Sequence, residues 1–389
     1  MKLIYLDWAA TAPILKEIPD LMSKALLDFQ GNPSSIHSEG KKARDQVNIA
    51  RKTCADLLEI KPEQLVFTSG GTESNSIILS SLFRKNKEAH IILSAIEHPS
   101  IYEYYESLKF SGFDIDFVKP NSKGIISPDI LLKLLKPNTI FVSIMAVNNE
   151  TGAIQAIDKL TETIRIYEKA NGRSIHFHTD AVQALGKIPF KPGLLNINSA
   201  SFSAHKIGGP KGVGLLYLQK PVQPLSAGGG QEFSIRPGTE NTTGIIALAK
   251  AMDISLTKVN NNFTHAKLLK DILRTELSKI EGVRLLFDSD RKDQDLYSPY
   301  ITSITVSPVP GEVLVRILSD EGIQVSTGSA CSSRYRKKQM RILLASDVSE
   351  QEAAGSIRIS SGWSNTEADI LNFISVLKAS VFELRKYHK

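Results

Sequence analysis

Residues 65 to 83 read LVFTSGGTESNSIILSSLF, and this stretch decides the fold. Three apolar residues, Leu65 to Phe67, have the length and composition of a buried strand. The polar, glycine-containing run Thr68 to Asn75 then leads into a helical pattern from Ser76 to Phe83. A strand that passes through glycines into a helix predicts a sheet covered by helices.

The same junction is suited to binding an anion. Gly70 and Gly71 let the backbone approach a phosphate, a helix N-terminus directs free N–H groups at it, and Thr72 adds a hydroxyl. A helix-capping turn without a ligand is the commoner use of such a sequence. Taken alone, the junction leaves both interpretations open.

The residues on either side repeat this alternation. Apolar runs predict further buried strands at 90–93, 140–145, 175–178 and 213–217. Apolar residues three and four positions apart predict helices between them, for example at 40–58 and 157–170. We therefore expect an α/β domain with a mostly parallel sheet flanked by helices, formed by residues 14–244.

The pattern changes after Thr243. Helices are predicted at 244–259, 266–280 and 312–320, and strands at 283–287, 301–306 and 356–360. This mixture predicts a smaller α+β domain made of residues 1–13 and 245–389.

Length and composition fit a soluble protein of two domains. The chain has 389 residues, of which 42% are hydrophobic and 23% charged. The formal net charge of +6 is small, and the basic residues are scattered apart from one cluster, so nucleic acid is not expected as a ligand. The cluster consists of Arg334, Arg336, Lys337, Lys338 and Arg341. Two cysteines, no secretory signal and no apolar run long enough to span a bilayer predict a cytoplasmic protein without membrane segments.

A second polar group follows the predicted strand at 175–178. Asp180 stands at the carboxyl end of this strand, where ligands of α/β sheets bind. A carboxylate beneath a pyridine nitrogen would keep that nitrogen protonated, and Gln183 could donate to a ring oxygen. Asp is also a common helix N-cap, so this residue alone fits either role.

A third group, Ser203-Ala204-His205-Lys206, lies beyond another apolar stretch and before a glycine-rich run. A lysine enclosed beside a strand end is costly to keep charged, and desolvation lowers its pKa towards nucleophilic use. A solvated surface charge is the commoner fate of a lysine. The phosphate-type turn and Asp180 favour the enclosed alternative.

Together these groups resemble the site of fold-type I enzymes that use pyridoxal 5′-phosphate (PLP). Further segments are similar to cysteine desulfurases, in the same order over nearly the whole chain: Tyr5 to Pro13, Glu97-His98-Pro99, Val147 to Gly152, Gly228 to Glu232, and Ser326 to Cys331. The resemblance is closest to the branch that supplies sulfur for iron–sulfur clusters and tRNA thiolation. It implies a seven-stranded type of sheet and a homodimer.

The resemblance also implies a role for each matching residue. Lys206 would hold PLP as a Schiff base, and His98 would stack on the ring and assist proton transfer. Asn149 and Arg358 would bind the substrate carboxylate, for which the planar, two-pronged guanidinium of Arg358 is well suited. The remaining cofactor contacts would come from Gly71, Thr72, Asp180, Gln183, Ser203, His205 and, in the neighbouring subunit, Thr239.

Cys331 would be the catalytic thiol. Its flanking residues are polar, unlike those of a packed core, whereas Cys54 is expected to be an inert residue on a helix. The implied activity converts L-cysteine to L-alanine, with the sulfur passing through a persulfide on Cys331 to an acceptor protein. The nearby basic residues favour its thiolate form, although they also fit a solvated face or a docking surface: Arg334, Arg336, Lys337 and Lys338.

The chain departs from the family at Phe233, where cysteine desulfurases commonly have an arginine after Gln-Glu. Three alternatives remain: a selenocysteine lyase, another PLP enzyme of this fold such as a transaminase, and a catalytically silent scaffold. A transaminase needs no thiol at position 331, so the presence of Cys331 argues against it.

Overall fold

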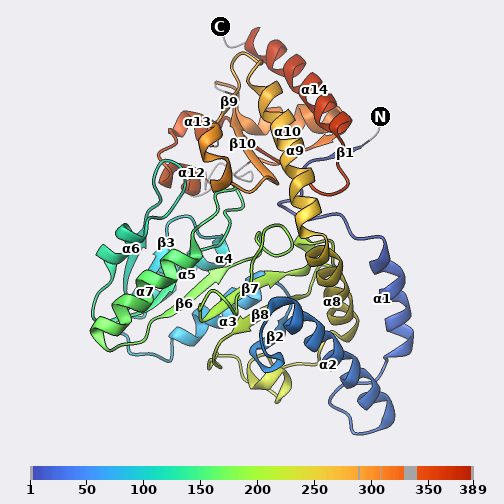
Figure 1. Ribbon diagram of the computed structural model, residues 1–389, viewed down its shortest axis with the longest axis vertical. Helices are drawn as coiled ribbons and strands as arrows, with labels where there is room; N and C mark the ends of the chain where they lie inside the picture. Colours follow the sequence, from blue (N-terminus) through green and yellow to red (C-terminus); the bar gives the residue numbers. More distant parts are fainter. Residues whose placement is uncertain (1–2, 288–289, 307, 328–339, 387–389) are drawn as a thin grey trace.

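The computed structural model describes residues 3–287, 290–306, 308–327 and 340–386, which form a large unit and a smaller one above it (Figure 1). The large unit is built on a seven-stranded sheet of order β2-β8-β7-β6-β5-β3-β4. Within it only β8 runs antiparallel to its neighbours, so the expected mostly parallel α/β fold is confirmed. The strands are β2 (Leu65–Thr68), β3 (His90–Ser94), β4 (Asp114–Val118), β5 (Thr139–Ser143), β6 (His176–Asp180), β7 (Ser199–Ser203) and β8 (Gly214–Leu218).

Helices cover both faces of this sheet. Successive strand residues point to opposite faces, so that Ile91 packs in one core and Ile92 in the other. One face carries α2 (Ser38–Leu58), α6 (Pro128–Leu134), α7 (Ile157–Asn171) and α8 (Thr242–Thr257), with α1 (Glu17–Asp28) packed on α8. The other face carries α3 (Gly71–Leu82), α4 (Pro99–Tyr102) and α5 (Tyr104–Phe110).

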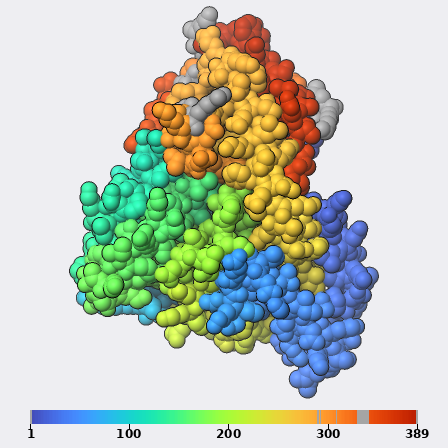
Figure 2. Space-filling model, viewed as in Figure 1, coloured from blue at the N-terminus to red at the C-terminus, as the bar shows by residue number. Residues whose placement is uncertain are grey.

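The smaller unit, orange to red in Figure 2, lies over one edge of the large one. Its three-stranded sheet pairs β10 (Ile301–Thr305) with β12 (Ser356–Ser360) and β9 (Arg284–Leu285). A second, two-stranded sheet pairs β1 (Ile4–Tyr5) with β11 (Ile323–Gln324). The helices are α9 (Val259–Leu277), α10 (Gly311–Asp320), α12 (Arg341–Ala345), α13 (Glu350–Ala354) and α14 (Glu367–Lys386).

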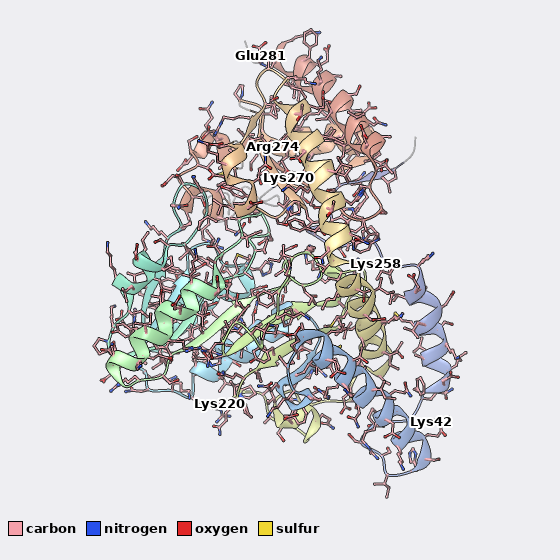
Figure 3. All side chains as sticks on the ribbon, in the orientation of Figure 1. Lys42, Lys220, Lys258, Lys270, Arg274 and Glu281 are labelled. Carbon is pink, nitrogen blue, oxygen red and sulfur yellow. The ribbon has the colours of Figure 1, made fainter. Side chains whose placement is uncertain are left out.

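The boundary between the units lies near the start of α9. Lys258, Lys270 and Arg274 mark the course of this helix from the large unit into the small one (Figure 3). The buried residues of α8 belong to the core of the large unit, whereas those of α9 pack with β10, β12 and α14. The expected division at 244/245 falls inside α8, and we propose that the domain boundary lies at residue 258, between α8 and α9.

Several predicted elements differ in their bounds. The helix expected from Ser76 begins at Gly71. The prediction missed its first turn because the residues there are polar and show no apolar periodicity. The strand expected at 283–287 is only two residues long, and β4 and β7 were not predicted. Among the described residues no helix has the length and apolar composition needed to cross a membrane.

Candidate active site

A cavity of about 330 Å³ lies at the carboxyl ends of β6 and β7, beneath the smaller unit. This is the position in which ligands of α/β sheets bind. Every predicted site residue that the structure describes lines it, except Thr239, and Cys331 lies outside the described residues. The lining residues are Ala9, Ala10, Gly71, Thr72, His98, Ser100, Met145, Asn149, Asp180, Val182, Gln183, Ser203, His205, Lys206 and Arg358.

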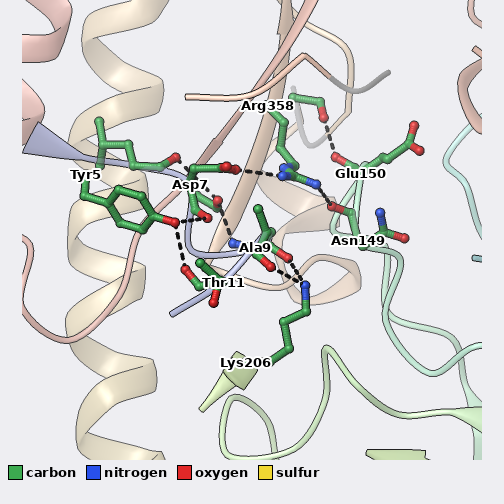
Figure 4. Close-up of polar contacts among 12 residues, drawn as sticks. Tyr5, Asp7, Ala9, Thr11, Asn149, Glu150, Lys206 and Arg358 are labelled. Carbon is green, nitrogen blue, oxygen red and sulfur yellow. Dashed lines mark hydrogen bonds and ion pairs between the residues drawn. The ribbon is translucent and has the colours of Figure 1, made fainter. Parts of the chain in front are cut away.

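Lys206 extends into this cavity from a single helical turn, Ala204–Lys206, that follows β7. Its Nζ donates to the carbonyl oxygens of Ala9 and Ala10, each at 2.7 Å (Figure 4). Burial, and next the charge of Arg358, lower the pKa of Lys206 to about 8. The enclosed lysine expected from the sequence is therefore present, and its amine loses its proton at a much lower pH than that of a solvent-exposed lysine.

Asp180 ends β6 and is 5% exposed. Its Oδ2 accepts a hydrogen bond from Asn75 Nδ2 at 2.9 Å, and its Oδ1 accepts one from the Val182 backbone N–H at 3.0 Å. Asn75 is held in turn by His178, whose Nε2 lies 3.0 Å from Asn75 Oδ1. These contacts fix the carboxylate at the cavity wall, and they show that Asn75, on α3, supports the site.

Gln183 is fixed by two neighbours. Its Nε2 donates to the Ala9 carbonyl oxygen at 2.9 Å, and its Oε1 accepts a hydrogen bond from Lys187 Nζ. Lys187 is 6% exposed, and burial lowers its pKa to about 7, with a further contribution from Lys206. Because the amide oxygen of Gln183 accepts the hydrogen bond from Lys187, the amide nitrogen is the group that Gln183 can offer to a ligand in the cavity.

The turn between β2 and α3 forms an anion cradle. Gly70 has a φ of +153°, and a Cβ added at Gly71 would come within 2.6 Å of Val182 Cγ2, so neither position accommodates a larger residue. The first N–H groups of α3 have no acceptor within the helix. His205 completes this wall, with its Nδ1 3.1 Å from Thr11 Oγ1.

His98 caps α4 at the rim of the cavity. Its Nδ1 lies 2.8 Å from Ser100 Oγ and accepts from the Ser100 backbone N–H at 3.2 Å. Burial lowers the pKa of His98, whereas the charge of Asp180 raises it. The opposite ring nitrogen, Nε2, is left available for a ligand.

Arg358 lies on β12, so the smaller unit supplies it to the cavity. Its Nη2 donates to Asp7 Oδ1 at 2.7 Å, and its Nη1 to the Asn149 carbonyl oxygen at 3.0 Å (Figure 4). Arg358 Nε and Asn149 Oδ1 are buried and have no hydrogen-bond partner within the described part of the chain. Such unpaired polar atoms at a cavity indicate a missing ligand.

Arg341 anchors the start of α12 beside the site. Its guanidinium donates to the carbonyl oxygens of Ala95 and Glu97 and lies 3.6 Å from the centre of the Tyr102 ring. Arg341, a member of the basic cluster, therefore packs against the protein and is not part of a solvated face. The other members of the cluster, like Cys331, lie outside the described residues.

Thr239 and Phe233 lie on the loop after β8, away from the cavity. Thr239 is exposed. The Phe233 ring, 49% exposed, packs 5.0 Å from the Arg51 guanidinium, which also forms a buried ion pair with Glu232 at 2.6 Å. The departure at Phe233 therefore leaves the described lining of the cavity intact.

Comparison with known proteins decides the family. A model of the family "Aminotransferase class-V" matches residues 4–373. The chain belongs to the class-V aminotransferase family. Proteins named cysteine desulfurase IscS are 38% identical in Dictyoglomus turgidum, over 98% of this chain and 95% of that protein, and 37% identical in Methanosarcina thermophila, over 99% and 93%.

Solved structures of class-V relatives share the fold. A structure described as a NifS-like protein has a TM-score of 0.89 and 34% identity, over 98% of this chain and 99% of that one. A second, described as SspA in complex with cysteine, has a TM-score of 0.77 and 30% identity, over 92% and 98%. The expected family and fold are thus confirmed.

The residues of this class-V site fit PLP. The turn at Gly71, where a Cβ would come within 2.6 Å of Val182 Cγ2, the buried carboxylate of Asp180 and the amine of Lys206, whose pKa is lowered to about 8, all line one cavity. The cavity therefore offers an anion cradle, a buried carboxylate and a reactive amine within one enclosure. Among the described residues no cluster of metal-binding side chains is present.

Proposed function

We propose that this chain is a PLP-dependent cysteine desulfurase, which converts L-cysteine to L-alanine and forms a persulfide on Cys331. The observation that carries the proposal is the lysine with lowered pKa at one cavity with Asp180 and Arg358, in a chain whose class-V relatives are named cysteine desulfurases. Cysteine is also the ligand named for the related structure of SspA.

The residues that would hold PLP surround the cavity. Lys206 would bind it covalently, Asp180 would face the pyridine nitrogen, and His98 would stack on the ring. When bound, PLP withdraws electrons from the substrate α-carbon and so makes its proton acidic. Gln183 would donate to the ring oxygen, and the phosphate would be held by Gly71, Thr72, Ser203, His205 and the partner subunit's Thr239.

The chain's own residues then bind the substrate and move its protons. Arg358 and Asn149 would hold the α-carboxylate, with Asn149 donating from its amide nitrogen, and the carboxylate would accept from Arg358 Nε, which is buried and has no partner among the described residues. With a pKa of about 8, the amine of Lys206 can take up and return the α-proton near neutral pH. His98 would assist in protonating the product before L-alanine leaves.

The Cys331 thiolate would attack the substrate sulfur, so that an S–S bond forms as the substrate C–S bond breaks. Ser326, five residues before the thiol, lies next to Arg358, because the Arg358 backbone N–H donates to the Ser326 carbonyl oxygen at 2.7 Å. Five residues reach at most about 18 Å, which is enough to place the thiol at the cavity. A sulfur-acceptor protein of iron–sulfur cluster assembly or tRNA thiolation, a homodimer and a cytoplasmic location complete the proposal.

Two variants test the proposal. Lys206→Ala should abolish the visible absorption of bound PLP, and an unchanged spectrum would refute the cofactor assignment. Cys331→Ser should keep the cofactor and bind L-cysteine but form no persulfide. Release of sulfide from L-cysteine by Cys331→Ser at the wild-type rate would show that Cys331 is not the nucleophile, and alanine formation by the wild type separates an active enzyme from a silent scaffold.

A further inference from the structure

Asp7 contacts Arg358 from outside the cavity. The two side chains are joined at 2.7 Å and are 17% and 8% exposed, so their charges are largely shielded from water. Asp7 does not line the cavity that contains Lys206. It lines a neighbouring hollow together with Tyr5 and Thr11. An incoming carboxylate would therefore meet Arg358 without displacing Asp7.

The two protein contacts of Arg358 leave donors free for a ligand. A guanidinium has five N–H donors, of which Asp7 and the Asn149 carbonyl oxygen each take one. Arg358 Nε has no partner within the described part of the chain. A carboxylate needs only two parallel donors. Asp7 thus orients the guanidinium while leaving a carboxylate-binding edge.

The position of Asp7 is fixed by the same strand that carries Arg358. Asp7 forms an isolated parallel bridge with Ser360 of β12. Its carbonyl oxygen accepts hydrogen bonds from the Ala10 backbone N–H at 3.0 Å and from Tyr5 Oη at 3.2 Å (Figure 4). These hydrogen bonds hold the backbone of Asp7 in place, so that its carboxylate stays within hydrogen-bonding distance of Arg358.

We propose that Asp7 is a positioning residue that sets the affinity of the substrate site for a carboxylate. It orients Arg358 and offsets part of its charge, so that the site holds an amino-acid carboxylate less tightly than Arg358 alone would. A buried guanidinium without a counter-charge is costly, and a ligand carboxylate would relieve that cost. The inference rests on the proposed function only for the nature of the ligand.

Asp7→Asn tests this proposal, because the amide oxygen keeps an acceptor for Arg358 and removes the charge. The variant should bind L-alanine, the proposed product, at least about threefold more tightly than the wild type. L-alaninamide, which has a neutral amide in place of the carboxylate, should bind no more tightly to the variant than to the wild type. Affinity is measured from the visible spectrum of the PLP-loaded protein and, independently, from the melting temperature of PLP-free protein.

Tyr5→Phe is the matched control, since it removes hydrogen bonds to the same segment but no charge, and it should leave the ratio of the two affinities unchanged. Asp7→Asn overturns the proposal if it binds L-alanine no more tightly than the wild type does, or tightens both ligands equally. A lower melting temperature with an unchanged ratio would mean that Asp7 is only structural, and would overturn it too. Failure of the wild type to form alanine would reject the desulfurase proposal, whereas the ratio in PLP-free protein still decides the role of Asp7.

Discussion

Burial and the charge of Arg358 lower the pKa of Lys206 from 10.5 to about 8, and this shift has consequences that can be measured at the residue scale. Only the neutral amine can bond to the aldehyde of PLP. The rate at which PLP-free protein regains visible absorption should therefore rise with pH, reach half of its maximum near pH 8 and level off above that pH. A rate that kept rising towards pH 10.5 would contradict the shift.

The same shift fixes the sign of the contribution of Lys206 to stability. Between the folded pKa of about 8 and the unfolded value of 10.5, the unfolded chain keeps a proton that folded Lys206 has lost. Stability rises with pH wherever the unfolded state binds more protons. The contribution of this group therefore becomes more favourable as the pH rises through that window.

Lys187 offers a prediction that separates stability from cofactor binding. Its Nζ donates to Gln183 Oε1 from a site that is 6% exposed. Lys187→Met should weaken PLP binding about fivefold, because the Gln183 amide can then rotate. The free energy of unfolding should stay the same or rise by about 1 kcal/mol, since the variant buries no charge. Equilibrium dialysis with PLP and urea unfolding check the two effects.

Lys169→Met, on the exposed face of α7, is the matched control and should change neither quantity. A Lys187→Met protein that bound PLP as tightly as the wild type would show that Gln183 needs no second contact.

The supporting residues of the site could not be predicted from the sequence. Lys206 and Asp180 each follow a stretch whose apolar residues mark the end of a strand, and both line the cavity as expected. Asn75, Lys187 and Asp7 act through contacts with residues far away along the chain or by burial, and their residue types have commoner roles on a surface or at a helix end. No local spacing identifies the contacts of Asn75 and Asp7, and the burial of Lys187, whose partner Gln183 is only four residues away, is set by tertiary packing.

At the element scale, the β2–α3 junction carries the anion cradle. A Cβ at Gly71 would come within 2.6 Å of Val182 Cγ2. Gly71→Ala should therefore displace the first turn of α3 and weaken PLP binding at least about tenfold, the equivalent of one charged hydrogen bond. Adding Val182→Ala to this variant removes the clashing methyl and should restore much of the affinity, as measured by PLP titration. An equal loss in the single and the double variant would contradict the steric explanation.

The predicted elements show where sequence patterns are sufficient. Continuous apolar runs such as Leu65 to Phe67 identified buried strands, since both faces of a parallel sheet are covered. β7 reads Ser-Ala-Ser-Phe-Ser and was missed, because small polar residues give no apolar run although the whole strand is buried. The long helices α2 and α7 were identified because burial of one face imposes a regular spacing.

At the scale of the whole molecule, the N-terminal segment joins the two units through the site. Leu6 N–H donates to the Gln324 carbonyl oxygen in the smaller unit, and Ala12 N–H donates to the His205 carbonyl oxygen in the large unit, each at 2.8 Å. The residues between these anchors contact Lys206 and Arg358. The position of one domain on the other therefore also sets the position of Arg358, the proposed substrate-binding residue, relative to Lys206.

The last prediction concerns the proposed homodimer. Thr239 is exposed and lies outside the cavity, which fits a role at the phosphate of the partner subunit. Suppose that each site combines Lys206 of one subunit with Thr239 of the other. A hybrid dimer of one Lys206→Ala subunit and one Thr239→Val subunit then has one complete site, in which the Thr239→Val subunit supplies Lys206 and the Lys206→Ala subunit supplies Thr239. A hybrid of the wild type with a subunit carrying both changes has none.

At limiting PLP, the first hybrid should therefore bind about half as much cofactor as the wild-type dimer. The second hybrid should bind PLP about tenfold to a hundredfold more weakly than the wild-type dimer, which is the cost of losing one hydrogen bond to a charged group. Differently tagged subunits allow each hybrid to be purified, and visible absorption measures the bound PLP. A contact within one subunit would give the reverse order, and hybrids that bind PLP equally would exclude Thr239 from the phosphate site.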